Sequence, residues 1–503
     1  MRRAVPIACV CLLACACSGP VWYALDDSVS GLGANMPAPP RSWHATTADR
    51  ADIIISAAAR WGAVPDDSME AGLASSVVDD RYYAIAGDWL AAQPDKQTSM
   101  PLAQALMVAE PLQSISLPRV ALPYDGLYPG QPGYALRRRV VVSASINAGH
   151  RADRAADQRR AAAVAAYIGS LPVAAAARGL AWVGAVGDMK PVGRTAALLE
   201  KHDGPQLVFG GMLPVMRSQD MLAGNLETAV TSRGSAWPKT YTFRMPAQAL
   251  GALRASGVDV VEIANNHVYD YSAVGFADTM AGLRAAGMPF VGAGMTPDEA
   301  ISPFSAFAGI EHVSLWALAA FPVERTGFSG RKDAAIQRGQ PGLLWADDWA
   351  LGAIVESMRA SSVDHPGHEL DVVSVHAGTE YAAGPDATQT ELYHRLIDGG
   401  ADVVLGHHPH VLQPMEWYQG PRHSGLIVYS LGNFVFGGMD GIPAARQTVL
   451  LSLGVLDGKV RAIRVYGGRL TDGTVDSLGD GSIERYVYAI SRTWRDRHGT
   501  SGR

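Results

Sequence analysis

Residues 403–410 read VVLGHHPH, and the pattern of this stretch indicates the fold class. Its first half, Val403 to Gly406, carries no polar side chain, which is typical of a strand buried on both faces of a parallel sheet. Three histidines follow at the point where that strand is expected to end. In open α/β sheets the ligand crevice lies at the carboxyl ends of the strands. The stretch therefore predicts a layered α/β domain with a site at one edge of its sheet.

The same arrangement recurs in four other segments, each a mostly apolar run that leads to a polar side chain. These segments are Ala181 to Gly187 before Asp188, Val258 to Ala264 before Asn265-Asn266-His267, Val372 to Val375 before His376, and Leu426 to Ser430 before Asn433. Between the runs, Phe276, Met280 and Leu283 fall at i, i+4 and i+7, which predicts a helix that covers the sheet. Five independent segments are thus expected to deliver polar side chains to one edge.

The residue types at this edge indicate metal chemistry. Imidazole, carboxylate and amide groups suit Mn, Zn or Fe, and two such ions about 3.5–4 Å apart activate a water for an in-line displacement. We therefore expect one or two divalent transition-metal ions. The ligands predicted from the strand ends are Asp188, Asn266, His376, His408 and His410. Two residues are predicted to be catalytic: His267 as a protonated imidazole for the leaving group, and Arg194 as a clamp on phosphate or carboxylate.

Several of these residues have a structural alternative. Asp188 could cap the turn that follows it, His376 could hydrogen bond at a strand end, and Arg194 could pair with a surface carboxylate. His407 is interpreted as a structural neighbour of the ligands, because the other two histidines of the stretch have the better spacing. Asn433 is interpreted as a turn residue that lines the crevice.

Six ordered motifs between Leu180 and Phe436 resemble the CapA family, which is named for poly-γ-glutamate capsule synthesis. The motifs are Gly187-Asp188 through Gly193-Arg194, Asn225-Leu226-Glu227, Ala264-Asn265-Asn266-His267 with Asp270-Tyr271 and Gly275, Val375 through Tyr381, Gly406 through Pro414, and Ser430 through Phe434. The resemblance implies a calcineurin-like metallophosphoesterase fold and a phosphoesterase-type site. It also implies a cell-envelope role in making, exporting or anchoring an anionic polymer such as poly-γ-glutamate, as a member of a capsule-synthesis complex.

Two positions depart from the pattern of working metallophosphoesterases. Their first motif is Asp-x-His, whereas this chain has Lys190 in the place of the histidine. Their second motif supplies a bridging Asp, whereas this chain has Asn225, with Glu227 two residues further on. The resemblance therefore adds Glu227 to the expected ligands, and the site holds two metals, one or none.

Three functions remain open at this point. The first is a capsule-polymer protein, the second is a metal-dependent phosphoesterase or hydrolase with a small substrate, and the third is a non-catalytic binding scaffold with a degraded metal site. The formal net charge of −6 gives no electrostatic reason to expect a nucleic-acid partner.

The beginning of the chain predicts export. Arg2 and Arg3 precede an apolar stretch from Ala4 to Ala16, as in a secretory signal peptide. All four cysteines lie in or next to this stretch, and Leu12-Leu13-Ala14-Cys15 resembles a bacterial lipobox with Cys15 as the lipidated residue. The alternative is an ordinary cleaved signal. We expect an exported protein of the bacterial cell envelope, anchored to the membrane by a lipid or free in the periplasm.

A chain of 503 residues is too long for one compact core, so at least two domains are expected. The expected parts are residues 1–17 as signal peptide, 18–41 as linker, 42–178 as a mostly helical accessory region, 179–470 as the layered α/β domain and 471–503 as a C-terminal extension. Within these parts, Arg151 to Ala166 predicts a surface helix. Val449 to Tyr466 predicts a hairpin turned by Asp457-Gly458, and Arg492 to Arg503 is expected to be frayed.

Overall fold

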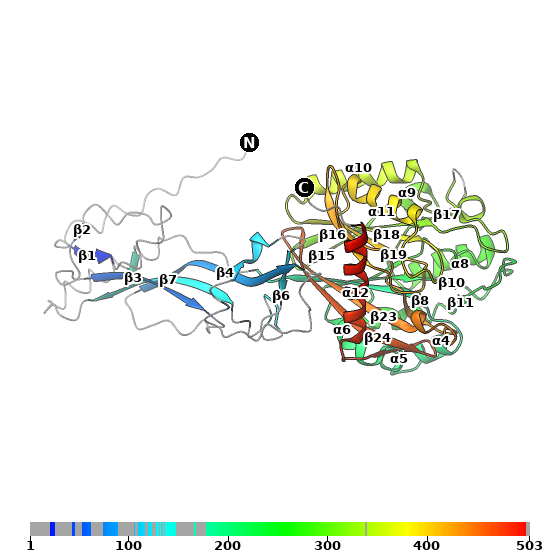
Figure 1. Cartoon of the computed structure of the whole chain (residues 1–503), viewed down its shortest axis with the longest axis horizontal. Helices are drawn as coiled ribbons and strands as arrows, with labels where there is room; N and C mark the ends of the chain where they lie inside the picture. Colours follow the sequence, from blue (N-terminus) through cyan, green and yellow to red (C-terminus); the bar gives the residue numbers. More distant parts are fainter. Residues whose placement is uncertain are drawn as a thin grey trace. The chain divides into compact units, whose positions relative to one another are not determined.

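The computed structural model describes residues 178–337 and 340–498, together with shorter stretches between residues 21 and 166. The chain divides into two compact units (Figure 1). The first comprises Met1–Ile85, Thr98–Leu112 and Pro123–Gly179, and the second comprises Ala86–Gln97, Gln113–Leu122 and Leu180–Arg503. Every residue predicted to belong to the site lies in the second unit.

The described part of the first unit is mostly β-sheet, so the prediction of a mostly helical region is wrong there. Strands β3 (Ile53–Trp61) and β4 (Ala74–Asp88) both pair antiparallel with β7 (Arg137–Ile146). The alanines of β3 favour a helix locally, but pairing along its whole length with a neighbouring strand outweighs that preference.

Two further predictions concern this part of the chain. Strand β1 (Val21–Leu25), which pairs with β2 (Trp43–Ala45) and with β3, lies inside the predicted linker 18–41. The helix predicted at Arg151 to Ala166 lies outside the described residues except for its last two positions, which are helical.

The second unit contains two large sheets. The first has the order β13-β12-β9-β8-β23-β24-β25, and β22 also pairs with β8. Its strands are β8 (Ala181–Lys190), β9 (Met221–Leu226), β12 (Val260–Glu262), β13 (Phe290–Val291), β22 (Asn433–Phe436), β23 (Gln447–Leu456), β24 (Lys459–Thr471) and β25 (Thr474–Ser477). Strands β9 and β22 run parallel to β8. The predicted hairpin is confirmed as β23 and β24, which extend the sheet beyond β8.

The second sheet has the order β15-β16-β18-β19-β21-β20. Its strands are β15 (Phe304–Ala308), β16 (Glu311–Ala320), β18 (Glu369–Ala377), β19 (Val403–His407), β20 (Met415–Gln419) and β21 (Ser424–Val428). The four central strands are parallel and the two outer ones are antiparallel.

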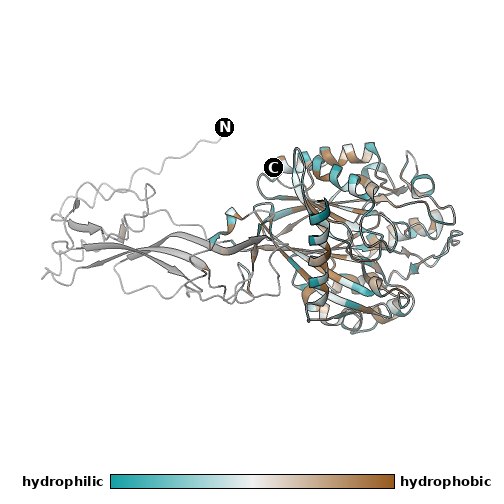
Figure 2. Cartoon of the chain, viewed as in Figure 1, coloured by the Kyte–Doolittle hydropathy of each residue, from teal (hydrophilic) through white to brown (hydrophobic). Residues whose placement is uncertain are grey.

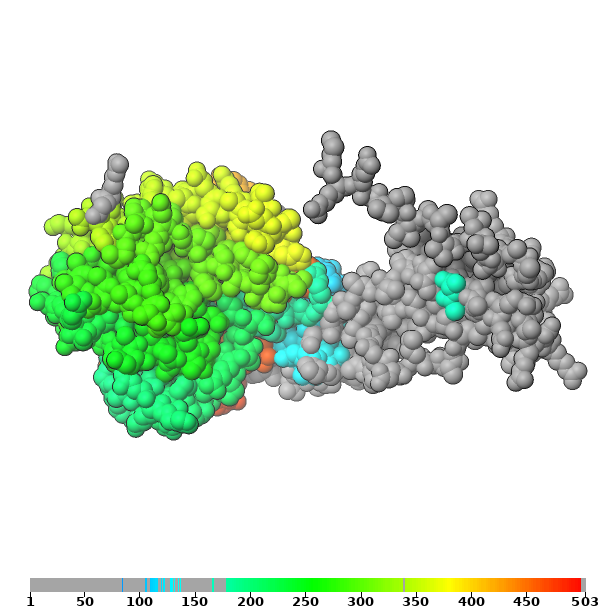
Figure 3. Space-filling view, turned by 180° about the vertical axis from the view of Figure 1, so that it is seen from behind, coloured from blue at the N-terminus to red at the C-terminus, as the bar shows by residue number. Residues whose placement is uncertain are grey.

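Helices cover the outer faces of the two sheets, with α10 and α11 above and α4, α5 and α6 below in Figure 1. The helices are α4 (Arg194–Leu199), α5 (Gly204–Phe209), α6 (Leu213–Arg217), α7 (Ala249–Ala255), α8 (Ser272–Ala285), α9 (Pro297–Ile301), α10 (Asp348–Asp364), α11 (Ala387–Gly399) and α12 (Ser482–His498). Figure 3 shows the reverse face of this unit, formed by green to yellow segments.

Short elements complete the described chain. They are β5 (Glu110–Pro111), η2 (Leu112–Ser114), β6 (Arg119–Leu122), η3 (Gly210–Met212), β10 (Ala229–Val230), β11 (Arg244–Met245), β14 (Ala293–Gly294), η4 (Gly330–Ala334), β17 (Gly342–Leu343) and η5 (Pro443–Arg446). None of the helices in the described part of the chain is both long and apolar enough to cross a bilayer.

The core explains why the strands are apolar on both faces. One buried cluster fills the space between the sheets, with Val183 of the first sheet and Leu315 of the second among its members. Another cluster packs Trp316 and Val373 of the second sheet against Ile354 of α10. Figure 2 shows hydrophobic residues in brown along strands and helices of this unit. Burial on both faces by a partner sheet and a helix layer confirms the predicted layered α/β domain.

The C-terminal end departs from the sequence prediction. Residues 492–498 are not frayed but belong to α12, which packs against β24 of one sheet and β20 of the other. Its Trp494 indole donates a hydrogen bond to Glu416 Oε2 at 3.2 Å. An amphipathic helix that buries its apolar side against two sheets is stabilised by that packing despite its polar composition.

Candidate metal centre

Five of the predicted ligands converge at the carboxyl ends of the parallel strands. Asp188 lies near the end of β8, and Glu227 directly follows β9. His376 is near the end of β18, while His408 and His410 follow β19. All five side chains are buried. The two sheets meet face to face, so each sheet delivers ligands to the same space.

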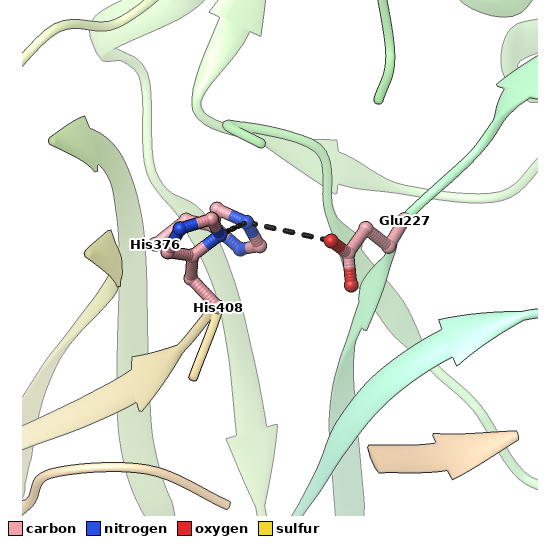
Figure 4. Close-up of side chains that lie close together, drawn as sticks. All are labelled: Glu227, His376 and His408. Atoms are coloured by element: carbon pink, nitrogen blue, oxygen red, sulfur yellow. Dashed lines mark hydrogen bonds and ion pairs between the residues drawn. The ribbon is translucent and has the colours of Figure 1, made fainter. Parts of the chain in front are cut away.

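Glu227 occupies the middle of this group. Its Oε1 lies 3.6 Å from His376 Nε2, as Figure 4 shows, and 3.8 Å from His410 Nε2. Neither carboxylate oxygen has a hydrogen-bond partner among the residues that the structure describes, although both are fully buried. A buried carboxylate without hydrogen bonds is costly, so this arrangement indicates that a cation belongs beside it.

The side chains form two groups that share Glu227. One contains Glu227, His376 and His408, the other Asp188, Glu227 and His410, and in each group the donor atoms lie within 4.8 Å of one another. His408 Nδ1 is 3.1 Å from His376 Nε2, close to the spacing of two ligands on one tetrahedral ion. The donors therefore fit one or two divalent transition-metal ions, with Glu227 between them.

The backbone of residues 403–410 bends after β19, at His408 and His410. His408 has φ 96° and His410 has φ 58°, both in the left-handed region that costs a non-glycine residue about 1 kcal/mol or more. The carbonyl of Pro409 accepts a hydrogen bond from the Tyr381 amide at 2.8 Å, which helps to fix the turn. As a result the two imidazoles enter different groups, one beside His376 and the other beside Asp188.

Asp188 is held in its ionised form by several donors. Its Oδ1 accepts from Asn225 Nδ2 at 2.8 Å and lies 3.1 Å from His407 Nδ1, while its Oδ2 lies 3.1 Å from His410 Nδ1. Burial alone would raise the pKa of Asp188, but the hydrogen bonds from His407 and His410 hold it well below its usual value. An ionised Asp188 is the form that binds a metal.

The histidines differ in protonation for reasons visible in their surroundings. Burial lowers the pKa of His376 well below its usual value and that of His408 to about 3, so both are neutral. Burial also opposes protonation of His410, but the charges of Glu227 and Asp188 raise its pKa to about 9. Burial, followed by the charge of Asp188, raises the pKa of Glu227. Neutral imidazoles are the metal-binding form, so His376 and His408 can bind an ion as they are, whereas His410 would first have to lose its proton.

His267, predicted from the sequence as the imidazole that serves the leaving group, lies beside the centre. Its Nδ1 is 2.7 Å from Asp270 Oδ2, and its Nε2 is 3.9 Å from Glu227 Oε1. Burial lowers the pKa of His267 to about 4, although Asp270 acts in the opposite direction. The Asp270 contact orients the ring, as carboxylates commonly orient histidines near metals.

Other predicted residues take supporting positions. Asn266 Oδ1 lies 3.0 Å from His376 Nε2, at the border of the first group. Asn433 Oδ1 lies 3.0 Å from His410 Nδ1, and its amide donates to the carbonyls of His410 and Ala445. Asn433 therefore lines the crevice and also positions a ligand.

His407 is wedged between two carboxylates. Its Nδ1 faces Asp188, and its Nε2 lies 3.0 Å from Glu262 Oε2. Burial would lower the pKa of His407, but Glu262 and Asp188 raise it to about 10. This placement explains the polar break that Glu262 makes in the run from Val258 to Ala264. The buried contact between His407 and Glu262 thus holds the His407 ring against Asp188.

Two predicted residues do not supply ligands in this geometry. The Lys190 ammonium donates to the Gly437 carbonyl at 2.9 Å and lies 3.9 Å from the centre of the Phe436 ring. Burial lowers its pKa to about 8, although the charge of Glu227 acts in the opposite direction. Arg194 is not brought into the centre. Its side chain is 64% exposed and lies 3.8 Å from Asp472 Oδ2.

Sequence reasoning missed residues that hold the centre together. Asn265 donates to Asn225 Oδ1 and to the Leu226 carbonyl, both at 2.9 Å, and its own Oδ1 accepts from the amides of His267 and Val268. It thereby ties the end of β9 to the loop after β12. The signal was present, because Asn265 stands inside a matched motif at a strand end.

Lys239 carried no such signal. It lies in an irregular segment between β10 and β11, yet its side chain is fully buried. Its ammonium contacts Asp270 Oδ1 at 2.8 Å, Glu324 Oε1 at 2.7 Å and the Asn266 carbonyl at 2.7 Å. A buried lysine with three acceptors orders the loop that carries His267.

Two packed sheets with a buried cluster of histidines and carboxylates at their strand ends define a layered α/β protein with a candidate metal centre. Residues 183–438 match the family described as "Bacterial capsule synthesis protein PGA_cap", and the chain belongs to this family. The resemblance to the CapA family is thereby confirmed.

Relatives from two bacilli carry related names. The chain is 32% identical over 253 residues to "PGA biosynthesis protein CapA" of Bacillus subtilis, covering 50% of this chain and 62% of the relative. It is 30% identical over 309 residues to "Capsule biosynthesis protein CapA" of Bacillus anthracis, covering 60% and 71%. A "Probable polyglutamine synthesis accessory protein" of Mycobacterium tuberculosis is 32% identical over 257 residues, covering 50% and 65%.

Two solved structures match the chain at low similarity. A hypothetical protein from Thermus thermophilus has 19% identity and a TM-score of 0.36, with 58% of this chain and 100% of that chain covered. The sulfate thiohydrolase SoxB from Thermus thermophilus has 12% identity and a TM-score of 0.31, with 61% and 48% covered.

Proposed function

We propose that this chain acts at the bacterial cell envelope in the synthesis, export or anchoring of poly-γ-glutamate or a related anionic polymer. Membership of the capsule-synthesis family supports this proposal, as do the two Bacillus relatives named for capsule or PGA biosynthesis. The polymer, and any partner proteins in a capsule-synthesis complex, belong to the proposal.

We further propose that the site holds one or two Mn, Zn or Fe ions. The observation that carries this proposal is the buried Glu227, whose two oxygens lack hydrogen-bond partners among the described residues and which both ligand groups share. Such ions supply an activated water and stabilise an oxyanion. The chain's own residues would hold the ions through the two groups, while Asp270 orients the neutral His267 next to them.

Elemental metal analysis of the full chain tests the site. The His408→Ala/His410→Ala variant is expected to contain one or two fewer transition-metal ions than the wild-type protein. A His202→Ala/His423→Ala variant, which removes two histidines outside the centre, serves as the matched control and is expected to keep the wild-type content. Equal metal content in all three proteins, after incubation with Mn and Zn, would make a non-catalytic scaffold the better proposal.

The number of ions depends on the position that Lys190 occupies. Exchanging Lys190 for His restores the residue type of the usual Asp-x-His motif. If a second metal position has been degraded, the Lys190→His variant should bind one more ion than wild type and turn over a phosphodiester faster. Unchanged metal content and turnover would show that this position is not a lost ligand.

A metal-dependent hydrolase with a small substrate is the second candidate, and the complete ligand groups favour it over a scaffold. Polymer measurements separate the two candidates. Deletion of the gene, complemented with either wild type or the His408→Ala/His410→Ala variant, should restore cell-bound polymer only with wild type. Restoration by both proteins would separate the metal centre from the polymer function.

We also propose that the chain is anchored to the membrane through a lipid on Cys15. The support is the lipobox-like sequence around it, which lies outside the described residues. Cells fed a labelled fatty acid should incorporate the label into wild type and into a Cys17→Ala variant, but not into Cys15→Ala. Labelling that persists in Cys15→Ala would exclude this residue as the anchor.

A further inference from the structure

A second cluster of histidines and acids lies at the other end of the second sheet. His312 is the second residue of β16 and Glu369 is the first residue of β18, and the two are direct neighbours in the parallel register. The ligand His376 is seven residues further along β18, which places it about 23 Å away at 3.3 Å per residue. The cluster is therefore separate from the metal centre described above.

The cluster converges on a single carboxylate oxygen. His312 Nδ1 lies 2.6 Å from Glu369 Oε2, and His365 Nδ1 lies 3.4 Å from the same atom. The two imidazole rings are stacked, with centroids 3.7 Å apart and planes 10° apart. His365 lies in the turn between α10 and β18, so three segments of the chain contribute to the cluster.

The hydrogen bonding of this cluster is incomplete. The Glu369 side chain is only 5% exposed, yet its Oε1 has no hydrogen-bond partner in the described part of the protein. His365 Nδ1 also makes no hydrogen bond there, although it lies 3.4 Å from Glu369 Oε2. Two unsatisfied polar atoms on neighbouring side chains are unfavourable unless something else satisfies them.

A metal ion of the zinc type fits these distances. Zinc lies about 2.0–2.2 Å from imidazole nitrogen and carboxylate oxygen, so neighbouring ligands of a tetrahedral ion are roughly 3.3–3.5 Å apart. The 3.4 Å between His365 and Glu369 already has this value. All three donor atoms lie within 4.8 Å of one another. The 2.6 Å contact between His312 and Glu369 would have to open by roughly 1 Å or less to reach the same spacing.

The surroundings favour a borderline cation over a hard one. Two imidazoles and one carboxylate suit zinc, cobalt or nickel, whereas magnesium and calcium take mostly oxygen ligands. The His365 side chain is 32% exposed, which gives an ion a route to the buried Glu369. The Phe307 ring packs edge-on against both imidazoles, at 5.1 and 5.8 Å, and forms an apolar wall beside them.

We propose that His312, His365 and Glu369 bind one Zn²⁺ ion in a structural site. The ion would join the first residues of β16 and β18 to the turn that follows α10, with water in its remaining position. It would stabilise the amino-terminal edge of the sheet, while the metal centre at the carboxyl edge remains a separate site.

Zinc titration of the full-length His408→Ala/His410→Ala protein tests this proposal, because that variant lacks the main centre. We expect about one Zn²⁺ per chain, with Co²⁺ giving the visible absorption of a four-coordinate ion. Adding His365→Ala or Glu369→Gln should weaken zinc binding at least tenfold and abolish the cobalt absorption. The matched control is His423→Ala, because His423 is also partly exposed (35%) and contacts a carboxylate, Asp402, at 3.2 Å.

The outcomes of this zinc titration can be told apart from those of the metal analysis that tests the main centre. Zinc binding that is equally strong with His365→Ala, Glu369→Gln and His423→Ala, or absent in all of them and in the parent variant, would overturn the structural site. His365 is partly exposed, so its replacement is expected to leave the fold intact, which circular dichroism in chelator checks. The parent variant already lacks His408 and His410, so the result at His365 and Glu369 does not depend on whether the main centre binds metal.

Discussion

Glu227 shows how a single residue connects stability to function. Both of its oxygens are buried without a hydrogen-bond partner among the described residues, and burial together with Asp188 raises its pKa. In the metal-free protein, the attraction of His410 and Lys190 does not offset the cost of burying this carboxylate. The cost is offset when a cation binds beside the carboxylate, which is the usual compromise at functional sites.

Replacing Glu227 by glutamine should therefore have opposite effects on metal binding and stability. The buried amide costs about 1–3 kcal/mol, less than an unpaired buried carboxylate, so the metal-free variant should gain about 1–2 kcal/mol in the free energy of unfolding. Its metal content should fall to that of the His408→Ala/His410→Ala protein. Urea unfolding in chelator and elemental analysis measure the two effects.

The matched control is Glu262→Gln. Glu262 accepts a hydrogen bond from the Ser374 hydroxyl and contacts His407, so neutralising it should lower the free energy of unfolding. A Glu227→Gln protein that keeps its metal, or that is less stable than wild type in chelator, would contradict the role given to this residue.

Asn265 is the residue whose loss should loosen the centre without removing a ligand. Its side chain makes four hydrogen bonds, two to the end of β9 and two to the loop after β12. Asn265→Ala leaves buried partners unsatisfied and should cost about 3 kcal/mol of unfolding free energy. Metal affinity should drop as well. Gln206→Ala, which removes one exposed bond to the Gly210 carbonyl, should change neither quantity.

At the scale of elements, the centre depends on how closely β8 approaches the segment before β22. The Asp188 amide donates to the Gly432 carbonyl at 2.9 Å. A Cβ on Gly187 would lie 2.0 Å from that same oxygen. Only glycine allows the two backbones to come this close, and their approach places Asp188 at the carboxyl edge.

Gly187→Ala should therefore destabilise the protein by about 3 kcal/mol or more, because a backbone oxygen cannot move aside as a side chain can. Gly251→Ala in α7 is the opposite case. Nothing lies within 4 Å of its added Cβ, so helix propensity should raise stability by up to about 1 kcal/mol. Denaturant midpoints of both variants test this. Similar midpoints for the two would refute the close-approach argument.

At the scale of the molecule, the candidate metal centre forms only if the two sheets of the second unit keep their positions relative to each other. Asp188 and Glu227 come from the first sheet, while His376, His408 and His410 come from the second. Helix α12 packs on a strand of each sheet, and the Ser491 hydroxyl accepts a hydrogen bond from the Met415 amide at 2.9 Å. The helix thus holds together the two halves of the centre.

A chain that ends before Ser482 should show this coupling. It loses the buried side chains of Ile483, Val487 and Tyr488, each contributing about 1.5–3 kcal/mol, which is a large part of a domain's stability. We expect a much lower thermal midpoint and reduced metal content. A chain that ends after His498 is the control and should match wild type. Equal midpoints for the two truncations would show that α12 does not hold the sheets together.

Local sequence pattern was enough to predict the strands of the second unit and most of the residues of its candidate metal centre. Runs such as Val403 to Gly406 must be buried on both faces, and the polar residues after them must then lie at the sheet edge. Asp188, His376, His408 and His410 were therefore predictable from local pattern alone. The family motifs added Glu227, which no periodicity indicated.

Which of these residues lie together in one group is set by tertiary packing. The unpartnered state of Glu227, the three acceptors of Lys239 and the position of Arg194 outside the centre depend on contacts between segments far apart in sequence. The sheet in the first unit and the order of α12 have the same origin, because packing and strand pairing there outweigh local propensity. Local pattern specifies which groups are buried, but only packing specifies what each buried group meets.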